Sequence, residues 1–258
     1  GALAALATYR EARDGFAAPL TVDDRSAAEC AELAGAIADA GYEFTARRLL
    51  SRHGIGDLSG ELVESAEAAA AAVRGLSGRA VMKIQSPDIL HKTEAGGVRL
   101  AIDTPEAAAA AYEELIASAK AYNPSARIAG VLVEPMAPAG VELILGVQND
   151  SVFGPTIMVG LGGIFTEIFE DTVLSLAVAT PEAAVALLKR LKGAPLLFGA
   201  RGRQPADVDA VAELVVALSR FAVQAGDRIA SIDLNPVIVH PEGDGLSVVD
   251  ALIVARDA

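Results

Sequence analysis

Cysteine is almost absent from this sequence, since Cys30 stands alone among 258 residues. A single thiol cannot form a disulfide within the chain, and its place in an alanine-rich segment is typical of a small core residue in a reducing compartment. The sequence also lacks an apolar run long enough to span a membrane, and it lacks the charged and apolar regions of a signal peptide. These absences predict a cytoplasmic location.

Basic residues are scarce as well. The chain carries 21 Lys and Arg against 34 Asp and Glu, which gives a formal net charge of −13. Such a charge opposes binding to nucleic acid or to an anionic membrane, because the field of the whole chain repels phosphate groups. If the protein binds a nucleotide, its basic groups must therefore be concentrated at one place.

Apolar residues, by contrast, make up 52% of the chain. This content is enough to bury the core of one large domain or of two small ones. Helical and strand patterns alternate with short turns, which predicts an α/β protein. We expect helices over residues 26–40, 44–53, 65–76, 104–121, 180–192 and 205–224. We expect strands over residues 80–84, 98–102, 130–134, 141–148, 156–160, 229–234, 237–240 and 246–249.

Residues 83–98, with the sequence KIQSPDILHKTEAGGV, are the most informative stretch. Lys83 lies in an expected strand, where a lysine can lie beside a polyphosphate. His91 and Lys92 follow on a polar segment bounded by a glycine pair, which allows a loop to approach a ligand closely. This combination suggests phosphoryl transfer through a histidine. There are simpler alternatives: strand alternation would let Lys83 face solvent, and His91 would be an ordinary surface histidine.

Gly162 and Gly163 belong to a second candidate segment, Gly-Leu-Gly-Gly, which follows an expected strand. Glycine loops of this kind expose backbone N–H groups that can bind phosphate oxygens. The segment is not a Walker sequence, and it lacks the GxGxxG pattern of dinucleotide sites. A tight turn without a ligand explains it equally well.

Hard oxygen ligands accompany the C-terminal strands. Asn235 and Asp250 bracket these strands, and an amide oxygen and a carboxylate on neighbouring strands suit Mg²⁺. The alternative is a turn, since Asn-Pro is a common turn former. Glu134 and Glu142 flank a loop between two strands and could equally be solvated, and Arg201 lies on a basic loop that could bind an anion.

The order of these segments resembles the ATP-grasp domain of NDP-forming, usually ADP-forming, acyl-CoA synthetases, which are relatives of the succinyl-CoA synthetase β subunit. The resemblance runs from about residue 43 to residue 255. It rests on the stretches VMKIQSPDILHKTEAGGV, GVLVEPMAPAGVELILGVQNDSVFGPTIMVGLGGIFTEIFED, APLLFGARGRQPAD and IDLNPVIVH, followed by VVDA. It implies an ATP-grasp domain over residues 26–258, with nucleotide between a small lobe (57–135) and a large lobe (136–258 with 41–56). Residues 1–25 are expected to be a linker from a preceding CoA-ligase region.

The same resemblance implies ATP or ADP and Mg²⁺ as ligands, in a reaction that converts acid, CoA and ATP to acyl-CoA, ADP and phosphate. His91 would carry a phosphoryl group between the nucleotide and an acyl-phosphate site on a partner domain, as a neutral imidazole can. The implied nucleotide residues are Lys83, Gly162, Gly163 and Arg201 near phosphates, and Glu134 and Glu142 near adenine and ribose. The implied Mg²⁺ ligands are Asn235 and Asp250, and the implied acidic supports of phosphohistidine are Glu167 and Asp233.

The sequence contains neither a CoA-binding Rossmann segment nor the histidine of the partner domain. We therefore expect the chain to act with CoA-ligase domains, in a longer polypeptide or on an α subunit. Two positions depart from the family pattern, because Thr93-Glu94 stands where relatives often have Ser-Asp and Arg203 where they often have an acid. A regulatory module of a protein lysine acyltransferase is the main alternative. An ATP-grasp carboxylate–amine ligase is a third interpretation and would not need His91.

Overall fold

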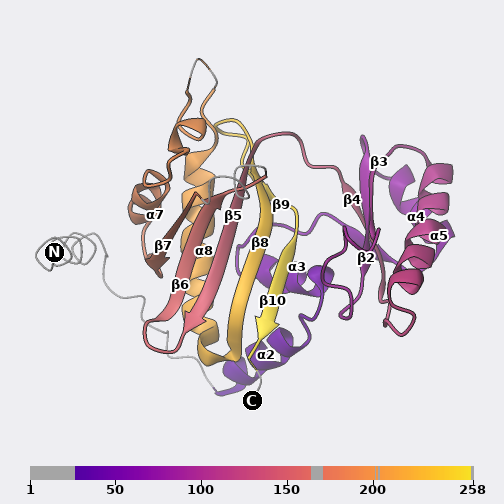
Figure 1. Cartoon of the computed structure of the whole chain (residues 1–258), viewed down its shortest axis with the longest axis horizontal. Coiled ribbons are helices and arrows are strands. Elements are labelled where there is room, and N and C mark those ends of the chain that lie inside the picture. The colour runs from indigo at the N-terminus through magenta and orange to yellow at the C-terminus, as the bar shows by residue number, and fades with distance from the viewer. Residues whose placement is uncertain (1–26, 164–170, 201, 203, 257–258) are drawn as a thin grey trace, which may run out of the picture.

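The computed structural model describes residues 27–163, 171–200, 202 and 204–256. The expected linker at residues 1–25, Glu167, Arg201, Arg203 and the side chain of Cys30 lie outside this description. The described elements form two lobes, each built around one antiparallel sheet (Figure 1). The expected α/β class is confirmed. No helix in these ranges is both long and apolar enough to cross a membrane.

The small lobe contains a four-stranded sheet in the order β1-β4-β2-β3. Two helices cover one face of this sheet (Figure 1). The other face of β2 is turned toward the large lobe, so all of its residues are buried. The elements are β1 (Glu61–Val63), α4 (Ala66–Arg74), β2 (Ala80–Gln85), β3 (Val98–Ile102), α5 (Pro105–Tyr122) and β4 (Gly130–Pro135).

The large lobe contains the strand path β10-β8-β5-β6-β7, with β9 paired to β8. Its strands are β5 (Val141–Asp150), β6 (Gly154–Leu161), β7 (Thr172–Leu176), β8 (Ile229–Val239), β9 (Leu246–Val248) and β10 (Ala251–Ala255). Its core includes residues of four helices, α2 (Ala27–Ala38), α3 (Glu43–Ser51), α7 (Pro181–Leu188) and α8 (Val208–Ala225). Short 3-10 turns lie at η1 (Ala194–Leu196) and η2 (Gly226–Arg228).

Local sequence explains where several helices begin. The hydroxyl of Thr104 accepts a hydrogen bond from the Ala107 N–H at 3.1 Å, and that of Thr180 accepts one from Ala183 at 3.3 Å. A proline occupies the first turn of each helix, as the repeated Thr-Pro-Glu signal predicts. The last long helix differs from expectation. It begins at Val208 rather than at residue 205, because the Asp207 carboxylate provides its cap.

The C-terminal strands also differ from expectation. Residues 229–234 and 237–240 were expected to be separate strands, but β8 continues through Asn235 and Pro236. The long strand β5 pairs with β8 on both sides of this point, across a register shift between Leu143 and Leu145. Strands β1, β7 and β10 were not expected at all. The Asn-Pro pair therefore does not end the strand, and Asn235 is held within a sheet.

Candidate nucleotide site

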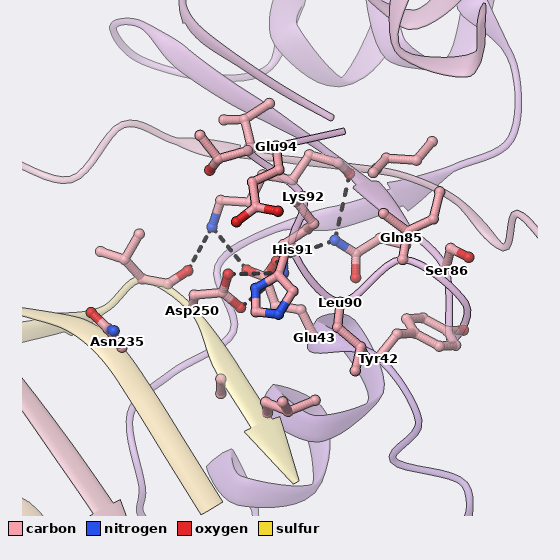
Figure 2. Close-up of a pocket in the computed structure, with 18 of the residues that line it drawn as sticks. Tyr42, Glu43, Gln85, Ser86, Leu90, His91, Lys92, Glu94, Asn235 and Asp250 are labelled. Carbon is pink, nitrogen blue, oxygen red and sulfur yellow. Dashed lines mark hydrogen bonds and ion pairs between the residues drawn. The ribbon is translucent and has the colours of Figure 1, made fainter. Parts of the chain in front are cut away.

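A cleft of about 490 Å³ lies between the two lobes. Strand β2 and the segment that follows it form one side, and β8 with the start of β10 forms the other (Figure 2). The cleft brings together five of the predicted site residues, although they are widely separated in the sequence. These are Lys83, His91, Asp233, Asn235 and Asp250.

The segment that carries His91 is anchored at both ends. At its start, Asp88 accepts hydrogen bonds from the Arg127 side chain at 2.7 and 3.0 Å and from the Arg127 backbone N–H at 2.8 Å. At its end, the Gly97 N–H donates to the Lys92 carbonyl at 2.7 Å. A Cβ at Gly97 would lie 2.5 Å from Ile84, so glycine is needed there. His91 itself is exposed and lines the cleft.

Lys83 does not face solvent, so the alternation argument is wrong at this position. Its side chain is 5% exposed, and its Nζ lies 2.8 Å from a Glu43 oxygen and 2.6 Å from a Glu134 oxygen. Nζ also donates to the Val249 carbonyl of the large lobe at 2.5 Å. Burial lowers the pKa of Lys83, but the surrounding carboxylates outweigh this effect and the net pKa is raised.

Glu43, at the start of α3, is the main functional residue that the sequence did not reveal. Its buried carboxylate contacts Lys83 and Arg47 through Oε1, and Lys92 and Gln85 through Oε2, at 2.8 to 3.4 Å. Burial raises its pKa, but the neighbouring cations more than offset this and leave the pKa below its usual value. In the sequence, Glu43 has only the pattern of an acid in a first helical turn. Apart from Arg47, one helical turn away, its partners Lys83, Gln85 and Lys92 lie far along the chain.

Lys92 joins this group to Asp250. Its Nζ lies 2.8 and 3.1 Å from the two Asp250 oxygens and 3.3 Å from Glu43 (Figure 2). Burial and the Glu43 carboxylate raise the pKa of Asp250, against the opposing effect of the lysines. A continuous set of ion pairs results, which we call the charge cluster. Its members are Glu43, Arg47, Lys83, Lys92, Glu134 and Asp250.

Glu142, Gly162 and Gly163 form a second group, outside the set of described residues that line the cleft. The Gly162 N–H donates to the Glu142 carbonyl at 2.7 Å. A Cβ at Gly162 would lie 2.9 Å from the Glu142 Cβ, and Gly163 has a φ of 63°, so both positions favour glycine. Glu134 does not belong to this second group. Its carboxylate lies in the charge cluster, 2.5 Å from the Arg47 guanidinium.

Asn235 and Asp250 offer hard oxygen atoms at one side of the cleft. The Asn235 N–H donates to the Asp250 carbonyl at 3.1 Å, so the two residues are neighbours. Within the described ranges, no three His, Cys, Asp or Glu side chains gather closely enough to hold a metal ion. An amide oxygen and a carboxylate would nevertheless suit Mg²⁺ in a nucleotide site, because Mg²⁺ usually takes one or two protein ligands and completes its shell with phosphate and water. Asp233 lies beside them and remains accessible to solvent, but the protein around its carboxylate removes part of its hydration and raises its pKa.

Comparison with known proteins agrees with this geometry. A family model described as an ATP-grasp domain matches residues 38–255. The two-lobed arrangement with its intervening cleft is therefore an ATP-grasp fold.

The relatives of the chain narrow the class further. It is 37% identical to the β subunit of ADP-forming acetate–CoA ligase II of Pyrococcus furiosus, over 83% of this chain and 91% of that one. It is 41% identical to trans-feruloyl-CoA synthase FCS1 of an unknown prokaryotic organism, over 83% of this chain but 30% of that one. The chain belongs to the ATP-grasp family of the ADP-forming acyl-CoA synthetases.

Solved structures show the same likeness. One is acetyl-coenzyme A synthetase 1 of Candidatus Korarchaeum cryptofilum with coenzyme A and Ca-AMPCP. It matches with a TM-score of 0.78 and 39% identity, over 83% of this chain and 93% of that one. Another structure of that enzyme contains Mg-AMPPCP, with its phosphohistidine segment pointing towards the nucleotide binding site. It matches at a TM-score of 0.73 and 34% identity, over 88% of this chain and all of that one. The relatives named here are ligases, which does not favour the regulatory-module alternative.

Proposed function

We propose that this chain is the nucleotide-binding part of an ADP-forming acyl-CoA synthetase and that His91 carries the phosphoryl group. The observation that supports this most directly is the cleft, where His91 lies with Lys83, Asn235 and Asp250. A histidine, a buried lysine and two oxygen ligands are the groups that phosphoryl transfer through histidine needs. Positioning and charge neutralisation supply most of the catalysis in such transfers.

In the direction that consumes ATP, a neutral His91 nitrogen attacks the γ-phosphorus. A nitrogen–phosphorus bond forms while the bond from that phosphorus to the bridging oxygen breaks, and ADP leaves with the oxygen. Lys83 would orient the phosphates from the wall of the small lobe. Asn235 and Asp250 would hold Mg²⁺, which neutralises phosphate charge when it is bound. In the opposite direction, an ADP oxygen takes the phosphoryl group from His91.

The roles of the remaining predicted residues follow from their location. Glu142 with the Gly162-Gly163 turn would contact the nucleotide outside the cleft that holds His91. Glu134 would set the position of Lys83, whose Nζ lies 2.6 Å from its carboxylate. It would also lie near the adenine and ribose of the bound nucleotide. Asp233, exposed beside Asn235, would support the phosphorylated imidazole.

We further propose that the chain acts with CoA-binding domains, on an α subunit or in a longer polypeptide. Two kinds of relative support this. One relative is a separate β subunit, and the match covers 91% of its length. The other is a longer protein, and the match covers 30% of its length. The acyl-phosphate that exchanges a phosphoryl group with His91 would form in those domains.

The test is labelling with γ-³²P-ATP and Mg²⁺, followed by separation of acid-labile from acid-stable phosphate. The wild-type chain, alone or with its CoA-binding partner, should acquire acid-labile label, and His91→Asn should acquire none. His53→Gln, which changes a histidine two residues beyond the end of α3, is the matched control and should label normally. Equal labelling of the His91→Asn variant would refute the proposed carrier.

A further inference from the structure

Lys92 connects the His91 segment to the opposite lobe. The segment lies between β2 and β3 of the small lobe, whereas both carboxylates that bind Lys92 come from the large lobe. Glu43 begins α3, which packs in the large core, and Asp250 directly precedes β10. The ion pairs of Lys92 therefore bridge the cleft, one residue from His91 (Figure 2).

We propose that Lys92 is a positioning residue that docks the His91 segment over the cleft, with Glu43 as a permanent acceptor and Asp250 as an exchangeable one. The proposal rests on the proposed role of His91 as phosphoryl carrier. It adds that metal binding at Asp250 changes how firmly Lys92 anchors the His91 segment.

The surroundings of the two carboxylates explain why they differ. The Glu43 side chain is fully buried, and both of its oxygens are held by other cations or amides of the cleft wall. The Asp250 side chain is 32% exposed, and its two oxygens lie against Lys92. A divalent cation can reach Asp250 but not Glu43. Once bound, the cation would replace Lys92 as the partner of the Asp250 carboxylate and would repel the Lys92 ammonium group.

A simpler role for Lys92 would be to bind the nucleotide phosphates. The two roles differ in what a neutral substitute changes. Loss of a phosphate ligand weakens nucleotide binding, whereas loss of a docking residue loosens residues 89–96 before any nucleotide is present. Loss of docking also slows transfer to His91 while leaving nucleotide affinity nearly unchanged. Removing the competing ammonium should in addition strengthen metal binding at Asp250.

The experiment compares Lys92→Met and Lys92→Arg, with Lys120→Met at the exposed end of α5 as a charge-matched control. Hydrogen exchange of residues 89–96 is measured without nucleotide, and ADP affinity and single-turnover labelling of His91 are measured with the partner present. For Lys92→Met we expect exchange to rise about tenfold and labelling to slow about tenfold, because a charge-assisted hydrogen bond is worth at least that factor. Lys92→Arg should restore both, and Lys120→Met should change neither.

Metal binding gives an independent readout. Mn²⁺, which shares the oxygen preference of Mg²⁺, can be followed by electron paramagnetic resonance in the presence of ADP. Lys92→Met should bind Mn²⁺ more tightly than the wild type, and Asp250→Asn should bind it more weakly. Unchanged Mn²⁺ affinity in Lys92→Met would refute the exchange at Asp250.

The remaining outcomes separate this proposal from the proposed function. Unchanged exchange of residues 89–96 in Lys92→Met, or weaker ADP binding with normal labelling, would overturn the docking role while His91 remains the carrier. Absence of label on the wild-type protein would instead overturn the carrier role, and the exchange measurement without nucleotide would still decide whether Lys92 docks the segment.

Discussion

Replacement of Lys83 by methionine should destabilise the protein by about 3 kcal/mol at pH 7. Removing one partner of a buried ion pair typically costs about 3 to 5 kcal/mol, because the other charge stays buried without compensation. Lys83 is buried between Glu43 and Glu134. The lower end of the range applies, since Arg47 still contacts both glutamates after the change.

Urea unfolding measures this effect directly. For a slope of about 2 to 3 kcal/mol per molar urea, the midpoint should fall by about 1 to 1.5 M. Lys120→Met provides the matched control and should remain within about 0.5 kcal/mol of the wild type, as exposed substitutions usually do. A midpoint for Lys83→Met equal to that of the control would refute the reasoning. It would mean that methionine packing compensates for the lost ion pairs.

The pH dependence supplies a second check on the same variant. In the wild type the pKa of Glu43 lies below its ordinary value of 4.5, so its stabilising contribution is complete above 4.5 and is lost as the pH falls through the lower folded value. Loss of Lys83 removes the strongest cationic influence on Glu43 and raises its pKa in the folded state. The variant can then protonate the buried carboxyl in mild acid. The stability difference between wild type and variant should therefore narrow as the pH falls below 4.5.

Two further predictions concern the anchors of the His91 segment. The Arg127 side chain and backbone N–H lower the pKa of Asp88 to about 2, so a carbon-13 titration should find its midpoint near that value, and Arg127→Ala should return it toward 3.8. Gly97→Ala should destabilise the protein by about 1 to 3 kcal/mol, because the new methyl would lie 2.5 Å from the Ile84 side chain. Gly35→Ala, where no atom lies within 4 Å of the added Cβ, is the control, and an equal effect of the two substitutions would contradict the packing argument.

Elements with strong local signals could be predicted from the sequence, and elements defined by their neighbours could not. The Thr104 and Thr180 caps, the buried strand β2 and the hairpin of β8 and β9 all follow from short patterns. Strand β7 gives no clear pattern in the sequence, because Leu174 and Leu176 are exposed and Val173 is its one buried apolar residue. The Asn-Pro pattern predicts a break in β8 at Asn235, whereas the pairing that keeps the strand continuous comes from β5, about ninety residues earlier in the chain.

The candidate site shows the same division. His91 could be identified because its informative neighbours lie on one segment. The burial of Lys83 does not follow from the sequence, because side-chain alternation says which face a residue occupies, but not whether another lobe covers that face. Glu43 had no local signal of function, and its importance comes from contacts with Lys83 and Lys92 across the cleft.

The charge cluster also resolves how so acidic a chain can hold a polyphosphate. A net charge of −13 predicts that the basic groups of a nucleotide site must be gathered at one place, and Arg47, Lys83 and Lys92 do gather there. Each is already paired, however, so the three cations face three carboxylates and the cluster is formally neutral. A neutral cluster attracts a polyphosphate weakly, and the nucleotide must bring positive charge with it. The half-buried Asp250 carboxylate is where a divalent cation can enter, and its entry gives the cluster a net positive charge while Lys92 stays paired with Glu43. The metal therefore supplies the positive charge that the nucleotide needs, and Lys92 remains the residue that holds the His91 segment.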